Sequence, residues 1–158
     1  MQLFIGKGHV YNGVRTDLKG VRADFQAQTG YLVQNTQLLD MNYIVNHIGK
    51  KTTSNVKADG TLKDAAHKVF RGSIDFKRAL RVAKGTESEQ VLLLGDEVIN
   101  QTIPLILCAE EDVEGNHGAA IGELDEETLL YFAARGIDKK HAEDIMTRAK
   151  LELLTHKI

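Results

Sequence analysis

The stretch VLLLGDEVINQTIPLILCAEED, residues 91–112, decides the fold class of this chain. It contains two apolar runs of strand length, VLLLGD and IPLILCAEED, and each run ends in glycine or acidic residues. Short runs rich in Val, Ile and Leu with such boundaries are typical of β-strands. No Asn-Gly or Asp-Gly pair stands between the two runs, so a tight two-residue hairpin does not connect them.

Similar runs recur over residues 1–122, namely FIG, HVYNG, GYLVQN, NYIVNHIG and VFRGSIDF. The tight-hairpin pairs occur only at Asn12-Gly13 and Asp59-Gly60, which is too few to connect so many strands. A solenoid solves this problem because each strand stacks on its equivalent one turn earlier, with Asn, Gly and small residues at the corners. We therefore expect a mainly β protein with a parallel β-helix core over residues 1–122.

Two alternatives to the parallel coil stay open at this stage. No strict repeat period is present, so an irregular antiparallel sandwich is the competing fold for the strand-rich region. In TLKDAAHKVF, residues 61–70, the apolar residues also fit helical spacing, which allows a short helical turn there.

The pattern changes to a helical hairpin over residues 123–158. Asp125 is a good helix N-cap, acidic residues follow it in the first turn, and Gly136 is placed to end the helix. Asp138 is a second N-cap before KKHAEDIMTRAKLELL, whose apolar residues mark one helical face. Short helices are marginal alone in water, so both apolar faces must dock on the strands or on a partner.

Composition excludes several classes of protein. The chain has 158 residues, 42% of them hydrophobic, and a formal net charge of -2, which suits one core and gives no basic excess for nucleic acid. No apolar run approaches the roughly 20 residues that a membrane helix needs, and the start lacks a secretory signal. The single cysteine agrees with a reducing compartment, so we expect a cytoplasmic protein without a membrane segment.

One stretch resembles a metal site or a catalytic loop: CAEEDVEGNHGA, residues 108–119. One cysteine and one histidine do not make a zinc site, and the EF-hand order of ligands is absent. We expect Cys108 to pack in the core as a small hydrophobe and the four carboxylates to form a solvated corner. His117 lies between Asn116 and Gly118 in a polar setting. Its spacing alone favours a solvated or capping histidine, and it is the remaining functional candidate of this stretch.

The order of motifs resembles one known family. The segments NHIGKKTTSNVKADGTLKDAAHKVFRGSIDF (46–76) and VLLLGDEVINQTIPLILCAEEDVEGNHGAAIGELDEETLLYFAARGI (91–137) resemble the carboxy-terminal part of the SufB/SufD family of iron-sulfur cluster assembly proteins. The resemblance implies a right-handed parallel β-helix followed by a small helical hairpin. It also implies a non-catalytic scaffold that pairs through its β-helix with a related subunit and recruits the ABC-type ATPase SufC through its carboxy-terminal helices. The residues expected to contact the ATPase are Leu129, Phe132, Ile145 and Met146.

The resemblance is closer to the SufD branch. The SufB branch is expected to carry a cysteine before the LLxGD strand and a glutamate after the histidine, and these positions hold Glu89 and Gly118 here. His117 matches the histidine that the SufD branch contributes to the interfacial site, which makes it the candidate ligand for iron or a cluster. Cys108 is a weaker ligand candidate. One cysteine cannot supply the four usual ligands, so we expect a transient cluster shared with a partner and none held stably by this chain alone.

The identity of the partner and the chemistry are left open by the sequence. The paired subunit can be SufB-like, or the chain can associate with itself. Family members are longer, so the chain is either a truncated form or a reduced paralogue. The second reading of function is a pure docking module without cluster chemistry, and the third is an independent metalloenzyme that uses His117 with the acidic turn.

Overall fold

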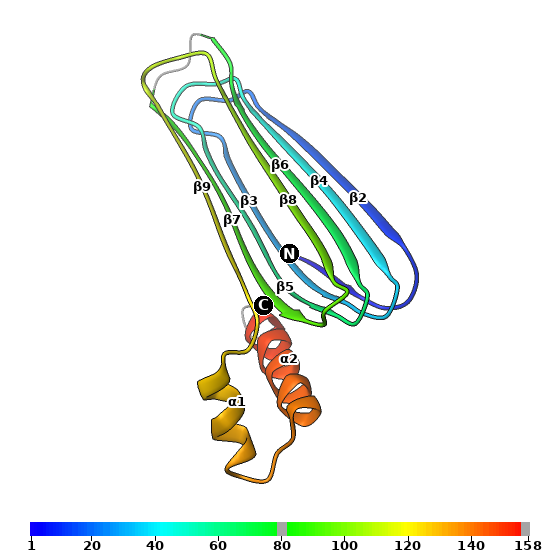
Figure 1. Ribbon diagram of the computed structural model, residues 1–158. Helices are drawn as coiled ribbons and strands as arrows, with labels where there is room; N and C mark the ends of the chain where they lie inside the picture. The colour runs from blue at the N-terminus through cyan, green and yellow to red at the C-terminus, as the bar shows by residue number, and fades with distance from the viewer. Residues whose placement is uncertain (79–81, 156–158) are drawn as a thin grey trace.

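The strands of this protein stack into a parallel β-solenoid, as a computed structural model shows for residues 1–78 and 82–155 (Figure 1). Within these residues the strands form two sheets, one in the order β1-β3-β5-β7-β9 and one in the order β2-β4-β6-β8. Every pairing is parallel. The strands are β1 Gln2–Ile5, β2 Val10–Leu18, β3 Asp24–Val33, β4 Leu38–His47, β5 Thr53–Lys63, β6 His67–Phe76, β7 Ala83–Leu94, β8 Ile99–Cys108 and β9 Val113–Gly122.

The parallel solenoid confirms the expected fold and removes both alternatives. The antiparallel sandwich is wrong, because consecutive strands lie in opposite sheets and pair with strands one coil away. Residues 61–70 are not helical, since they form the end of β5, a turn and the start of β6. The missing repeat period has a simple cause: Thr53 pairs with Asp24 one coil earlier and with Lys84 one coil later, so the coils differ in length.

The core lies between the two sheets, and alternate residues of each strand fill it. Its largest fully buried side chains include Tyr31, Tyr43, Phe70 and Phe76. The corners contain non-glycine residues with left-handed backbone at Arg22, Asn35, Lys51, Asp64 and Val82. Asn35 and Asp64 suit such corners because their short polar side chains tolerate this conformation, but Arg22, Lys51 and Val82 are not the Asn, Gly or small residues that were expected there.

The helical hairpin follows β9 and consists of α1 Glu126–Ala133 and α2 Lys139–Thr155. Asp125 caps α1 by accepting a 2.6 Å hydrogen bond from the Thr128 N–H, and Asp138 accepts a 2.9 Å bond from the His141 N–H. Gly136 has φ of 74° between the helices. Both predicted caps and the predicted glycine stop are therefore confirmed.

α2 is attached to the five-stranded sheet through β3 and β5. Ala142 is buried, and the Lys150 ammonium lies 2.9 Å from the Asp59 carboxylate. A second ion pair joins Lys63 to Asp144 at 2.7 Å. Neither helix in the described part of the chain is long and apolar enough to cross a bilayer.

Candidate functional site

The last coil of the solenoid, made by β8 and β9, is open on one side. β8 pairs with β6 and β9 pairs with β7, and among residues 1–78 and 82–155 no further strand follows in either sheet (Figure 1). Edge strands of this kind leave a row of backbone N–H and C=O groups free to pair with another chain. The last coil therefore exposes the unpaired backbone groups of its strand edges. It also leaves accessible the inner-face side chains that a further coil would cover.

His117 lies on this open coil, in β9, and is exposed. It is in register with Glu87 of β7, which is in register with Val56 of β5. Glu87 and Val56 are buried inner-face positions, so His117 occupies the position at which this inner stack reaches the open end. The fold thus presents the predicted histidine on an exposed strand at the end of the stack.

Cys108 is exposed, so the expectation that it packs in the core is wrong. Its inner-face stack runs through Leu18, His47 and Phe76, which are all buried, and ends at Cys108. Cys108 does fall on the inner face of β8, as the alternation predicted, but no further coil in the described part of the chain covers this position. The Cys108 thiol instead donates to the Glu110 carbonyl at 3.0 Å.

The structure does not bring Cys108 and His117 together. Across the interior from β8, Ile106 faces Gly115, so Pro104 faces His117 and Cys108 lies four strand positions further along. Four positions correspond to roughly 13 Å along a strand. Across the described ranges, 1–78 and 82–155, no three His, Cys, Asp or Glu side chains gather closely enough to hold a metal ion.

The acidic turn before β9 is largely solvated, as predicted. Glu111, Asp112 and Glu114 are exposed, and Glu110 is partly exposed. The Glu114 carboxylate lies 2.8 Å from the Lys84 ammonium and accepts a 3.1 Å hydrogen bond from Asn116, and these contacts lower its pKa. The carboxylates of this turn do not converge on His117.

A buried cluster of charged side chains lies one coil below the open end, and reasoning from the sequence missed it. Lys68 and Glu89 form an ion pair inside the solenoid, and Glu89 also accepts hydrogen bonds from Tyr31 and Thr102. Burial lowers the pKa of Lys68, although Glu89 opposes this effect. The available signal was the alternation itself, because Lys68, Glu87 and Glu89 all fall on inner-face positions.

Glu87 is the unusual member of this cluster. Its side chain is only 4% exposed, and no described residue donates a hydrogen bond to its carboxylate. Burial, followed by the nearby Glu89 carboxylate, raises the pKa of Glu87 to about 7. A buried carboxylic acid without a partner is costly in a folded protein, which marks Glu87 as a candidate functional group.

His47 is a structural histidine in the same interior. It is fully buried, with hydrogen bonds to Thr52 Oγ1 at 2.8 Å and Ser54 Oγ at 2.9 Å. Its ring packs on Phe76 at a centroid distance of 4.7 Å. Burial lowers the pKa of His47 to about 4, so the ring is neutral at physiological pH.

The four predicted contact residues of the helical hairpin differ in how exposed they are. Leu129, Phe132 and Met146 are partly buried, whereas Ile145 is 42% exposed. Two exposed apolar residues of α1 were not predicted: Leu130 at 69% and Tyr131 at 55%. Leu129 and Leu130 line a cleft of about 460 Å³ between α1 and the start of α2.

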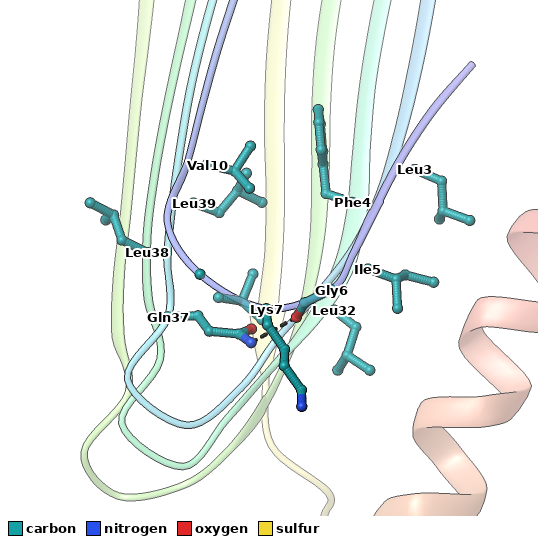
Figure 2. Close-up of a pocket in the computed structure, with 12 residues that line it drawn as sticks. Leu3, Phe4, Ile5, Gly6, Lys7, Val10, Leu32, Gln37, Leu38 and Leu39 are labelled. Carbon is teal, nitrogen blue, oxygen red and sulfur yellow. Dashed lines mark hydrogen bonds between the residues drawn. The ribbon is translucent and has the colours of Figure 1, made fainter.

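A second cavity, of about 240 Å³, lies at the first coil (Figure 2). It is lined mainly by apolar side chains, including Leu3, Phe4, Leu32 and Leu39, and the Gln37 amide donates to the Gly6 carbonyl across it at 2.7 Å. These strands stand at the opposite end of the stack from β8 and β9. The cavity is therefore separate from the coil that presents His117.

Together, the fold and the open coil define a parallel β-solenoid protein that presents a histidine and free strand edges beside a helical hairpin. The family model described as "SUF system FeS cluster assembly, SufBD core domain" matches residues 1–150. The chain belongs to this family.

Individual relatives agree with this assignment. The iron-sulfur cluster assembly protein SufD of Bacillus subtilis is 30% identical over 100 residues, which cover 63% of this chain and 23% of the relative. A chloroplastic SufBD family protein of Arabidopsis thaliana is 29% identical over 111 residues, 70% of this chain and 20% of the relative. A SufBD family protein of Staphylococcus aureus is 24% identical over 122 residues. The matched part of the chain therefore spans only 20% to 26% of the length of these relatives.

Proposed function

We propose that this chain is a SufD-like scaffold subunit in iron-sulfur cluster assembly, and that it supports the assembly without catalysing a reaction itself. The observation that carries the proposal is the position of His117, an exposed imidazole in the last coil of the solenoid. An imidazole at a strand edge becomes part of an interface as soon as another strand adds to that edge. In this proposal the chain provides half of a site, and a paired subunit completes it.

Pairing through the last coil is supported by the apolar outer face of β8. Ile103, Leu105 and Leu107 alternate along this edge strand and are 46–50% exposed, while Ile106 between them packs against the interior. Apolar side chains on an edge strand are unfavourable in an isolated protein because they promote association. A SufB-like subunit or a second copy of the chain would cover both the strand edge and this face.

Docking of an ABC-type ATPase is assigned to the helical hairpin. The exposed Leu130 and Tyr131 side chains lie next to the partly buried Leu129 and Phe132 in α1, and Ile145 adds apolar surface in α2. Aromatic and leucine side chains beside a cleft are typical anchors of protein interfaces. The hairpin therefore offers a compact surface for a protein partner that is separate from the strand edges.

The histidine is tested by replacing His117 with Ala in the complex assembled with the ATPase and the paired subunit. We expect cluster yield, followed by visible absorbance, to fall by roughly tenfold or more. Mutation of a residue that only hydrogen-bonds to a metal ligand already lowers metal affinity or activity by about that factor, and removal of the ligand itself should lower it at least as much. Asn116→Ala is the matched control, since Asn116 is the exposed neighbour on the outer face of the same strand. An unchanged yield with an intact complex would remove His117 from the mechanism.

The second candidate function, a docking module without cluster chemistry, shares the hairpin surface. Capture of the ABC-type ATPase by the folded chain, lost on Leu130→Glu or Ile145→Glu, supports docking under either function. If His117→Ala leaves cluster yield unchanged while these variants abolish capture, the docking module is the better description. If the folded chain does not capture the ATPase at all, docking through the hairpin is wrong.

A further inference from the structure

Glu87 lies one coil below His117 in the same stack of inner-face residues. The register of β7 and β9 makes the two residues Cα partners. Neighbouring strands of a sheet lie about 4.8 Å apart, so the two side chains leave the backbone at adjacent levels. No residue of the described chain separates these two positions along the stack.

Both side chains leave the inner face of the five-stranded sheet. A Cβ added at Gly85, two residues before Glu87, would meet Ile74 and Phe76 of the interior. A Cβ added at Gly115, two residues before His117, would meet Ile106 and Phe76. Since side chains of a strand alternate between faces, residues two positions apart share a face. Glu87 and His117 are therefore directed toward the same interior space, which is open above His117.

The Glu87 carboxylate crosses the interior to the opposite sheet. A Cβ added at Gly72 of β6 would overlap both carboxylate oxygens of Glu87, so the absence of a side chain at Gly72 makes room for this carboxylate. Gly72 is in register with Pro104 of the open coil, which faces His117 across the interior. The carboxylate therefore lies beside Gly72, in the coil below Pro104, at the edge of the space that His117 faces.

The Glu87 and Glu89 carboxylates differ in whether other side chains already neutralise them and hydrogen-bond to them. Glu89 is neutralised by Lys68 and accepts further hydrogen bonds from Tyr31 and Thr102. Glu87 is equally buried, and it has no such donor among the described residues. Of these two buried carboxylates, only that of Glu87 is without an ion-pair or hydrogen-bond partner among the described residues and so is free to bind a cation.

We propose that Glu87 and His117 form a two-donor site for a divalent first-row metal ion, completed by water or by a partner's ligands. Imidazole and carboxylate together suit ions such as Fe²⁺, Co²⁺ and Zn²⁺. The inference deepens the proposed function and rests on it for the choice of iron as the natural ion. It adds a buried carboxylate to a site for which sequence reasoning supplied a histidine alone.

The test is a calorimetric titration of the full chain with Co²⁺ alone, used as a stand-in for Fe²⁺. We expect Glu87→Gln and His117→Ala each to raise the dissociation constant by roughly tenfold or more. The double variant should bind no more weakly than the weaker single variant, because either change already destroys the pair. Glu114→Gln is the matched control on β9, and it should leave the affinity unchanged.

Two results would overturn the site: no Co²⁺ binding by the wild-type chain, or binding that Glu87→Gln leaves unchanged. Circular dichroism of each variant checks the fold. If Glu87→Gln does not fold, it is replaced by Glu87→Asp, which shortens the side chain by one methylene and so withdraws the carboxylate. Cluster yield and ATPase capture are measured separately. Their failure leaves a positive Co²⁺ result standing, and a negative Co²⁺ result leaves the scaffold proposal standing.

Discussion

Lys68 and Glu89 form an ion pair that is almost completely removed from solvent, with side-chain exposures of 0% and 1%. Charges are costly to bury, and such a pair is stable only because each partner compensates the other and Tyr31 and Thr102 satisfy the carboxylate. The pair lies in the coil directly below the open end and is joined to that end by hydrogen bonds with Thr102 of β8.

Breaking this pair should strongly destabilise the protein. We expect Lys68→Met to lower the free energy of unfolding by about 3 to 5 kcal/mol, because it leaves Glu89 buried and uncompensated. Adding Glu89→Gln to Lys68→Met should restore at least half of the lost free energy of unfolding, because the buried negative charge of Glu89 is then absent. Denaturant unfolding measures both. Lys84→Met at the exposed pair with Glu114 is the control and should have no measurable effect. Equal losses for Lys68→Met and the double variant would contradict this explanation.

His47 should make stability depend on pH in acid. Its pKa is about 4 in the folded protein against an ordinary 6.5, so the unfolded chain takes up the proton first as pH falls. The contribution of His47 is therefore fully present above pH 6.5 and is lost between pH 6.5 and 4, by about 3 kcal/mol in total.

Comparison with His47→Gln separates the pH-dependent contribution of His47 to stability from those of the other titrating groups. The difference in unfolding free energy between the wild type and the variant should shrink, or change sign, by about 3 kcal/mol from neutral pH to pH 4. Thr52 and Ser54, the hydrogen-bond partners of His47, do not titrate in this range. A difference that stays constant with pH would show that His47 is not held neutral by burial.

Gly60 should not tolerate a side chain. An added Cβ would overlap the Tyr31 ring, which is fully buried and whose hydroxyl donates to Glu89 at 3.0 Å. We expect Gly60→Ala to cost about 1 to 3 kcal/mol through overpacking. Gly13→Ala on β2 has nothing within 4 Å of the new Cβ and should be close to neutral. A thermal melt in which both variants match the wild type would refute the packing of Tyr31 on Gly60.

The outer face of β8 should matter for association and not for stability. We expect Leu105→Lys with Leu107→Lys to leave the melting temperature nearly unchanged, because both side chains are 46% exposed. Association with the paired subunit should weaken by about tenfold or more if this face is the centre of the interface. Tyr11→Lys on the edge strand β2 at the other end of the stack is the control, since Tyr11 is 73% exposed. Unchanged pairing of the β8 variant would place the interface elsewhere.

The fold was predictable because its signals are local and repeated. Many strand-length runs with only two hairpin pairs among them predicted parallel stacking. Asp125, Gly136 and Asp138 marked the helical hairpin through cap chemistry that depends only on neighbouring residues. The coil lengths differ, so the repeat was not visible as a fixed period.

The candidate site was only partly predictable, because it depends on where stacking stops. The alternation of β8 placed Cys108 on the inner face correctly, but a sequence pattern does not say which coil is the last. His117 was selected by its polar surroundings, whereas Glu87 was missed because pairing between β7 and β9 is a long-range property. Charged residues at inner-face positions were the one local signal that pointed to the cluster.

The central claim is that this chain supplies half of a cluster site. The most direct test is anaerobic reconstitution with iron and sulfide, performed in parallel on the isolated chain and on the complex with its paired subunit, with cluster content measured by visible absorbance and iron analysis. The account predicts a cluster on the complex and none retained by the isolated chain. A stoichiometric cluster held by the isolated chain, or equal amounts on the complex with and without His117, would contradict it.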